Sequence, residues 1–593
     1  MEPRTEIRPG PGGAAVAAAV SACTLAALLL RTHQTDVPFA DGSQAAIPWL
    51  AAHEWGWSWL FAHPEGMLSS LLARWYAHAV LFAGGALDER AWRLPMAVCG
   101  SLLVPLTYAL MRGLGCQRWS ALTAAGIVAV SPPLVTDARV PFAHETLAVT
   151  LGAAVVWTHL IRLGRPSPPA TWLVGIVLGL YVSSHRLAYA VPLVVVVAAL
   201  IERGPAGGWR GLGERGLWLP AAVAIVLKGL AWAWHGDDGT AAGVPDGAAP
   251  DRVGLLPLTI GVLGPPWAAV CAVGTAVGLG MLARRDRRAL PAVWSAAFLA
   301  PLAIWGDLLG GDRPEIALVP GAYAATLAGC ALLDALAAAV AAADEPAPSL
   351  RRLIRGVGLA GAALALLGSI NNQFTASRWR ALTSTVDYGR APPDRGYKAA
   401  GYYIRQFVPR EAAVFVADER SRAAGSMPAF YFGRVLPRGA DRGPPDWPRV
   451  LDAVRGQVDV LVVGARQRAR ADAWTEFERA ACLRRDGRPV LYVLARRGLS
   501  LPCVDQEIGP WNAAYDREHP LRWIPTVVRT SGRTEEVERG VVRALDGPAG
   551  AEDAAAADGA AHPGRQNGGS GDAAREMTLR PRSGWTVPES PDR

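Results

Sequence analysis

The sequence predicts an α-helical polytopic membrane protein that ends in a small, water-soluble α/β domain. Three observations lead to this fold class. Of the 593 residues 51% are hydrophobic, and only 19% are charged, which is too apolar for a soluble chain of this length. The apolar residues gather in long runs within residues 1–374. Residues 375–593, by contrast, have the composition of an ordinary soluble chain with a polar tail.

The apolar runs are long enough to cross a bilayer. A spanning helix needs about 20 predominantly apolar residues, because the hydrocarbon core is about 30 Å thick. Arg74 and His78 interrupt the run at 67–83, so we expect an interfacial or re-entrant helix there. The sequence predicts eleven spans in total, at residues 13–30, 94–111, 119–135, 142–161, 171–184, 188–201, 217–234, 254–282, 289–306, 315–340 and 356–374.

Arginine placement predicts the orientation of these spans. With the N-terminus in the cytoplasm, the inside segments hold the arginine clusters at 284–288 and 351–355, as the positive-inside rule requires. An odd number of spans then places the C-terminal domain outside the plasma (inner) membrane. We expect the first run to be a retained span rather than a signal peptide, because no small-residue cleavage site follows it closely. The net charge of +8 is spread between the apolar runs, which argues against nucleic acid as a partner.

The C-terminal part predicts a small α/β domain with a partly parallel sheet. Strand-like apolar runs at 412–417, 458–463 and 490–494 alternate with helical patterns. The sequence therefore divides into a membrane domain at 1–374, whose first outer loop spans 31–93, an extracytoplasmic domain at 375–530 and a disordered tail at 531–593. The helices expected in the second domain lie at 397–407, near 447–456 and near 468–482.

The seven cysteines form no CxxC or Cys/His cluster, so the sequence predicts no metal site from them. Two of them, Cys482 and Cys503, fall in the soluble domain. If this domain faces an oxidising compartment, these two residues form a disulfide. The alternative is a pair of unlinked thiols.

The first outer loop contains the acids that are best placed for catalysis. Asp36 and Asp41 follow the first span directly. A carboxylate just beyond a span meets lipid head groups and can take a proton from an acceptor hydroxyl as a general base. The tryptophans of the same loop are typical of a helix lying at the membrane interface, and anchoring alone explains them.

Arginines at the outer ends of spans are the second group of candidates. Arg139, Arg186 and Arg313 all lie where the phosphate of a membrane lipid would lie, and a guanidinium can hold phosphate oxygens in a bidentate fork. The alternative is that each side chain extends to the membrane surface without a ligand. His144 and Glu145 begin the fourth span, where they either orient a substrate or favour the helix N-terminus electrostatically.

Four short motifs, taken in their order along the chain, resemble a known family. They are HPEG at 63–66, RLP at 93–95, SPP at 131–133 and DARVPF at 137–142. Their order and their positions relative to the spans are similar to those of the GT-C superfamily of membrane glycosyltransferases. The nearest group is that of the protein O-mannosyltransferases and aminoarabinose transferases (glycosyltransferase family 39-like). The motifs lie within residues 36–145, and the shared topology covers 13–374.

The resemblance implies an activity. Such enzymes transfer a sugar from a polyprenyl-phosphate donor to an acceptor protein, lipid or glycan on the outer face, with inversion. An outer-loop acid activates the acceptor, and arginines stabilise the departing lipid phosphate. By position Asp41 matches the catalytic acid, and Asp36 is the second choice. The implied substrate-binding residues are His63, Arg93, Asp137, Arg139, His144, Glu145, Arg186 and Arg313.

The sequence departs from the family pattern at two places. Gly42 stands where the family has a second acid, and the histidine motif reads His63-Pro64-Glu65-Gly66. The missing acid removes an acceptor or metal ligand, so a divalent metal cofactor cannot be inferred. Two alternatives stay open. A transporter or flippase would show a buried acid near mid-membrane, and a non-catalytic assembly protein would show no acid beside the arginines.

Overall fold

The protein was analysed as a computed structural model, and every structural statement below concerns the parts of the chain that the structure describes. These are residues 13–32, 67–83, 88–184, 189–235, 265–305, 315–342, 396–409, 411–417, 431–432, 456–465, 475–509 and 511–512.

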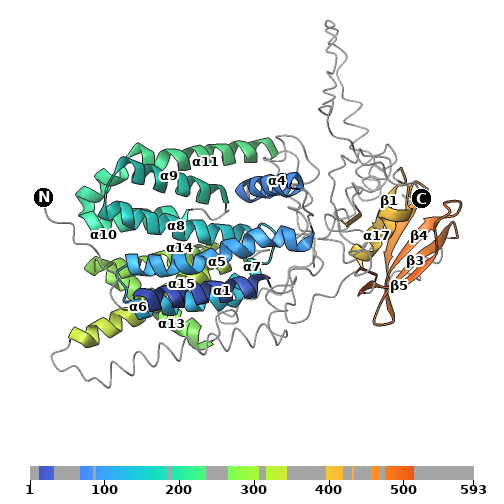
Figure 1. Cartoon of the computed structure of the whole chain (residues 1–593). Coiled ribbons are helices and arrows are strands. Elements are labelled where there is room, and N and C mark those ends of the chain that lie inside the picture. The colour runs from blue at the N-terminus through green and yellow to red at the C-terminus, as the bar shows by residue number, and fades with distance from the viewer. Residues whose placement is uncertain are drawn as a thin grey trace, which may run out of the picture.

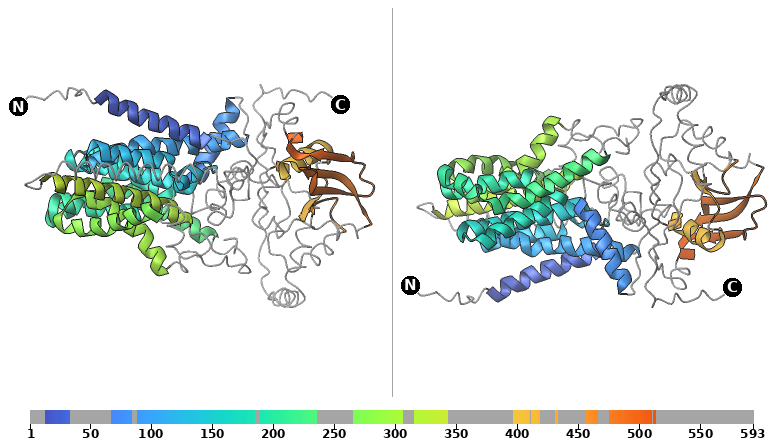
Figure 2. Two further views of the ribbon diagram at one scale, coloured as in Figure 1. Left: turned by 90° about the horizontal axis from the view of Figure 1, so that it is seen from below. Right: turned by 90° about the horizontal axis from the view of Figure 1, so that it is seen from above.

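Long helices form a bundle, and a small mixed domain lies beyond one end of it (Figure 1). Figure 2 shows the same separation from below and from above. We call the end of the bundle that faces the C-terminal domain the domain end, and the other the opposite end. The helices of the bundle are α1 (Gly13–Thr32), α5 (Glu89–Gly113), α6 (Arg118–Val130), α8 (His144–Gly164), α9 (Pro168–Ser184), α10 (Ala190–Leu212), α11 (Arg215–His235), α13 (Pro265–Met281), α14 (Leu290–Trp305) and α15 (Glu315–Ala342).

A described helix overlaps each predicted span except the last, 356–374, which is outside the described residues. By length and composition, five of the described helices can cross a membrane unaided. They are α1, α5, α8, α10 and the Val319–Val340 part of α15. The predicted helix at 67–83 is present as α4 (Met67–Phe82). The expected polytopic helical fold is confirmed, and the number of spans stays a prediction.

Three helix boundaries differ from the predicted ones for local reasons. Helix α5 begins at Glu89 rather than at 94, because Asp88 caps it by accepting a hydrogen bond from the Ala91 N–H at 2.7 Å. The span predicted at 119–135 breaks after α6, and the short helix α7 (Pro132–Asp137) restarts on prolines. Helix α10 continues to Leu212 through a kink at Gly204, where φ is +67°.

Glycine lets α9 and α11 approach closely. A Cβ atom at Gly175 of α9 would lie 2.0 Å from the carbonyl oxygen of Gly216 at the start of α11. One turn later, a Cβ atom at Gly179 would lie 2.9 Å from the Pro220 oxygen. Small residues at such crossings are a common device of membrane helices, whose association depends on close backbone packing.

The C-terminal domain is a five-stranded mixed sheet covered by one described helix, α17 (Tyr397–Phe407). The strands are β1 (Val414–Ala417), β2 (Val460–Gly464), β3 (Phe477–Arg485), β4 (Arg488–Arg496) and β5 (Val504–Glu507). Their order is β1-β2-β4-β3-β5. The pairs β1–β2 and β3–β5 are parallel, whereas β2–β4 and β4–β3 are antiparallel. The predicted α/β class with a partly parallel sheet is confirmed.

The helix predicted near 468–482 was wrong for its described part. Residues 477–485 form β3, which returns as β4 through a two-residue turn. Asp486 and Gly487 of this turn have φ values of 52° and 72°, as a tight Asp-Gly hairpin turn requires. The nearby Cys482 is buried and Cys503 is exposed, and both are free thiols rather than a disulfide. The predicted helix near 447–456, apart from its last residue, and the tail at 531–593 lie outside the described residues.

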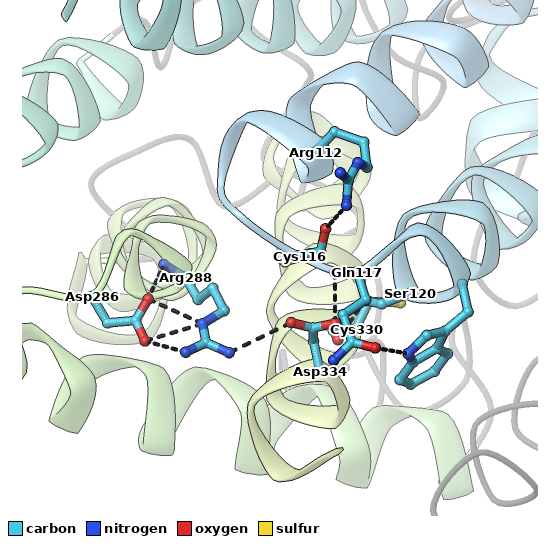
Figure 3. Close-up of polar contacts among 9 residues, drawn as sticks. Arg112, Cys116, Gln117, Ser120, Asp286, Arg288, Cys330 and Asp334 are labelled. Carbon is cyan, nitrogen blue, oxygen red and sulfur yellow. Dashed lines mark hydrogen bonds and ion pairs between the residues drawn. The ribbon is translucent and has the colours of Figure 1, made fainter. Parts of the chain in front are cut away.

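A cluster of paired charges holds the loops of the opposite end together (Figure 3). Arg288 binds Asp286 at 2.7 Å and reaches Asp334 of α15 at 3.5 Å. Asp334 also accepts a hydrogen bond from the Gln117 N–H, at 2.8 Å, in the turn between α5 and α6. Asp286 and Asp334 share Arg288, and Asp334 also accepts from a backbone N–H, so these side chains are engaged with one another and form a structural clamp.

Alanine substitution of two mid-helix glycines will separate close packing from helix propensity. We expect Gly175→Ala to lower the thermal stability of the detergent-solubilised protein, because overpacking typically costs about 1–3 kcal/mol. Gly126→Ala, on α6, is the matched control, because nothing lies within 4 Å of a Cβ atom there. It should leave stability unchanged or raise it slightly. Equal stability of the two variants would contradict the packing of α9 on α11.

The clamp also predicts a pH dependence. Partial burial raises the pKa of Asp286, but hydrogen bonds from the Arg288 side chain and backbone and the charge of Arg288 outweigh burial, so the net shift is downward. Because the pKa of Asp286 is lower in the folded state, its ionised carboxylate stabilises the fold at pH values above the unfolded pKa of about 3.9. This stabilisation is lost as the pH falls from that value through the folded-state pKa. Thermal unfolding between about pH 6 and about pH 3 should therefore show a steeper loss for the wild type than for Asp286→Asn. Parallel curves would contradict the pairing.

Candidate functional site

The structure describes half of the predicted site residues and gathers them at the domain end. Arg93 lies on the second turn of α5, and Asp137 ends α7. Arg139 follows α7, and His144 and Glu145 begin α8. The predicted residues outside the described part of the chain are Asp36, Asp41, His63, Arg186 and Arg313.

The DARVPF segment is a compact loop between α7 and α8. Thr146, on the first turn of α8, donates a hydrogen bond from its hydroxyl to Oδ2 of Asp137 at 2.5 Å. This contact closes the loop and places the Asp137 carboxylate beside the turn that carries His144 and Glu145. The loop thus presents two acids and a histidine at the domain end of the bundle.

Arg139 is anchored to the end of α1. Its side chain is buried, and its Nε and Nη2 atoms both donate to the carbonyl oxygen of Leu30, Nε at 3.0 Å. The last carbonyls of a helix have no partner within the helix and carry partial negative charge. A guanidinium at this position therefore satisfies an α1 carbonyl that would otherwise be buried without a donor.

Arg31 is a second buried guanidinium at the same helix end, and it is not among the site residues expected from the sequence. Its Nη1 donates to the carbonyl oxygens of Ala129 at 2.9 Å and Ala27 at 3.2 Å, and its Nη2 donates to that of Val128 at 3.2 Å. The side chain is 0% exposed. The sequence feature that could have indicated a site role for Arg31 is its position as the first charged residue after the first apolar run.

The two arginines form a concentrated positive site. Arg139 lies close enough to Arg31 to interact with it electrostatically, and Nε of Arg31 has no hydrogen-bond partner among the described residues. Gly100 of α5 makes room for the pair, because a Cβ atom there would lie 3.0 Å from Nε of Arg31 and 2.8 Å from Cβ of Ala138. Buried like charges repel one another at low dielectric. An anion bound here would relieve that repulsion.

Three aromatic side chains brace the site against α4. The ring centroids of Tyr76, Trp92 and Phe142 lie 5.9–6.4 Å apart in tilted or edge-to-face contacts. Phe142 has a φ of 51°, a left-handed conformation that costs about 1–2 kcal/mol for a residue with a side chain. Its ring is 1% exposed, so burial offsets the strain and fixes the DARVPF loop relative to α5.

Among the described residues, no group of three or more His, Cys, Asp or Glu side chains is placed to hold a metal ion. What the described site residues do offer is anion binding by the guanidinium groups of Arg31 and Arg139. Carboxylates and an imidazole lie beside it to orient a polar substrate.

Residues 78–235 match the family model described as dolichyl-phosphate-mannose-protein mannosyltransferase. This range ends with α11 at His235 and includes Arg93 and the whole DARVPF loop. A search of curated protein sequences gives no significant match.

Solved structures of membrane glycosyltransferases share the fold. Apo ArnT from Cupriavidus metallidurans matches with a TM-score of 0.53 and 16% identity over 81% of this chain and 98% of that one. The same enzyme bound to undecaprenyl phosphate matches with a TM-score of 0.49 and 16% identity, over 82% and 98% of the two chains. The apo oligosaccharyltransferase of Archaeoglobus fulgidus matches with a TM-score of 0.50 and 12% identity over 82% and 75%.

At these identities the structural likeness shows the fold alone, and the family match concerns residues 78–235 of the 593. The motifs in HPEG-to-DARVPF order, the helical bundle and the C-terminal mixed domain agree with both. The chain therefore has the fold of membrane glycosyltransferases such as ArnT and the archaeal oligosaccharyltransferase, and its residues 78–235 are similar to the protein mannosyltransferase family.

Proposed function

We propose that the chain transfers a sugar from a polyprenyl-phosphate-linked donor to an acceptor on the outer face of the membrane, with inversion at the anomeric carbon. The observation that carries this proposal is the buried pair Arg31 and Arg139 at the domain end. The family description supports it, because it names a dolichyl-phosphate-linked sugar as donor and covers the segment that contains Arg139.

The arginine pair holds the phosphate of the donor. In the transfer, the bond between the anomeric carbon and the phosphate oxygen breaks, and the leaving phosphate gains negative charge. Preorganised positive groups that face this charge lower the barrier most where water is excluded. Arg31 and Arg139 are held in place by helix carbonyls, so they need little reorganisation when the charge develops. Arg93, which is also buried, serves as a further phosphate ligand.

The general base comes from the first outer loop, with Asp41 as first choice and Asp36 as second. The base takes the proton of the acceptor hydroxyl, whose oxygen then attacks the anomeric carbon from the side opposite the phosphate. The length of the connecting chain limits how far each candidate can lie from Arg31, because an extended chain spans at most about 3.6 Å per residue. Asp36 therefore lies within about 18 Å of Arg31, and Asp41 within about 36 Å.

The remaining site residues orient the substrates. Asp137, His144 and Glu145 hydrogen-bond sugar or acceptor hydroxyls from the closed DARVPF loop. We assign His63 of the first outer loop, together with Arg186 and Arg313 at the expected outer ends of spans, to the donor site as well. In this arrangement the N-terminus is cytoplasmic, and the domain end faces outward, so that the C-terminal domain meets the acceptor protein, lipid or glycan.

A transporter would be favoured by a buried acid near the middle of the bundle. Among the described residues, the buried acids are Glu89 and Asp334. Glu89 starts α5 at the domain end, and Asp334 belongs to the clamp at the opposite end. No described residue therefore favours transport over transfer.

Removal of one guanidinium should slow transfer strongly. We expect Arg139→Gln and Arg31→Gln each to lower the rate of sugar transfer from a radiolabelled polyprenyl-phosphate donor pool in membranes by about 10²–10³-fold. Arg165→Gln is the control, since Arg165 is exposed at the opposite end. Wild-type rates in both site variants, at equal expression, would overturn the phosphate role.

Replacement of the candidate bases tests the other half of the mechanism. We expect Asp41→Asn to eliminate transfer and Asp36→Asn to retain it; the reverse result would assign the base to Asp36. Asp505→Asn, on the exposed surface of the C-terminal domain, controls for the loss of one acid. Full activity of both loop variants in the same assay would contradict the proposed base, while transfer by the wild type would keep the enzyme class.

A further inference from the structure

A buried ion pair joins the bundle to the C-terminal domain. Glu89, the first residue of α5, is 2% exposed, and Lys398 on the first turn of α17 is 4% exposed. The Lys398 Nζ atom lies 3.0 Å from Oε1 and 3.2 Å from Oε2 of Glu89. In Figure 1, α17 lies on the side of the sheet that faces the bundle. The contact therefore links residues 309 positions apart in the sequence.

Tyr431 completes the contact. Its hydroxyl donates to Oε1 of Glu89 at 3.0 Å. Its carbonyl oxygen accepts a hydrogen bond from Nε of Arg405 at 2.6 Å. Gly401 leaves room for this carbonyl, because a Cβ atom there would lie 2.5 Å from it. Helix α17 thus holds Tyr431 in place and presents Tyr431 and Lys398 to the same carboxylate.

Apolar residues from both sides surround the ion pair. Trp92 and Met96 of α5 belong to the same continuous core as Tyr397 and Ala400 of α17. A buried charge that loses its partner is strongly destabilising, because neither water nor another charge compensates it. The chain contains only two lysines, Lys228 and Lys398, among 59 basic residues. Lys398 supplies a compact ammonium that fits between the two oxygens, whereas arginine supplies a planar fork.

The ion pair lies one helical turn from a proposed substrate ligand. Glu89 and Arg93 are four residues apart on α5 and so share one face of the helix. Arg93 is 3% exposed. A contact that holds the first turn of α5 in place therefore also holds the backbone that carries Arg93.

We propose that Lys398 and Tyr431 are positioning residues for transfer, and that the C-terminal domain completes the site by holding the first turn of α5 through Glu89. The proposal rests on the proposed function, in which Arg93 binds the donor. It assigns the C-terminal domain a direct part in donor binding, in addition to any contact with the acceptor.

A double-mutant cycle tests the coupling to Arg93. We expect Lys398→Met to lower the transfer rate of the full-length protein in membranes by about 10–100-fold, as small misplacements of substrate ligands do. Arg93→Gln should lower it as well, and the double variant should be no slower than Arg93→Gln alone. Glu89→Gln/Lys398→Met should be faster than Lys398→Met, because no unpaired charge stays buried. Additive losses in Lys398→Met/Arg93→Gln would overturn the proposal.

A measurement that does not need activity separates this contact from the proposed function. Hydrogen exchange of the full-length protein should be faster for residues 89–98 in Lys398→Met than in the wild type. Exchange of β3 and β4 should stay unchanged, which shows that the domain is folded. The control is Arg484→Met, which breaks the exposed ion pair with Asp505 and should change neither transfer nor exchange at α5. Unchanged exchange at 89–98 in Lys398→Met overturns the contact, whereas faster exchange in a chain that transfers nothing overturns only the proposed function.

Discussion

The hydrogen bonds from Arg31 and Arg139 to the carbonyl ends of α1 and α6 determine the structure of the domain end. Backbone carbonyls at a helix end that is buried among other helices must find donors, because water is absent there. Two guanidinium groups supply the donors and bring two positive charges to one place. Structural need and affinity for anions thus arise from the same atoms. A purely structural cap would need only neutral donors, whereas this pair also carries the positive charge with which the proposed function binds a phosphate.

Further contacts connect the two arginines to α5 and, through α5, to the C-terminal domain. Gly100 allows α5 to lie against Arg31, and the Phe142 ring ties the DARVPF loop to α5. Glu89 then links the start of α5 to the C-terminal domain. The site is therefore built from segments far apart in the sequence, and its rigidity comes from packing around α5.

The features that depend on local pattern could be predicted from the sequence. Described helices overlap ten of the predicted ranges, because a run of about 20 apolar residues has few other stable structures in a membrane. The RLP and DARVPF motifs directed attention to Arg93, Asp137 and Arg139, which the structure places at one end of the bundle. The strands at 414–417, 460–464 and 488–496 coincide with apolar runs that the sequence predicts as strands.

Features that depend on tertiary contacts or on one turn were missed. In the sequence, Arg31 looks like any charged residue that follows a span. Its role depends on the tertiary packing of α6 and α7 against α1. The apolar residues of the strand at 477–485 have a spacing that also fits a helix. The pairing of this strand is determined by the Asp486-Gly487 turn, which the expected helix did not take into account. The partners Glu89 and Lys398 are 309 residues apart, so no local pattern could join them.

Binding of the donor lipid itself tests the central claim most directly. Native mass spectrometry of the detergent-solubilised protein can compare polyprenyl phosphate with polyprenol, which has the same chain but no phosphate. The arginine pair predicts that the wild type retains the phosphate but not the alcohol, and that Arg31→Gln/Arg139→Gln retains neither. Equal retention of both lipids by the wild type, or undiminished binding of the phosphate by the double variant, would contradict the role of the pair.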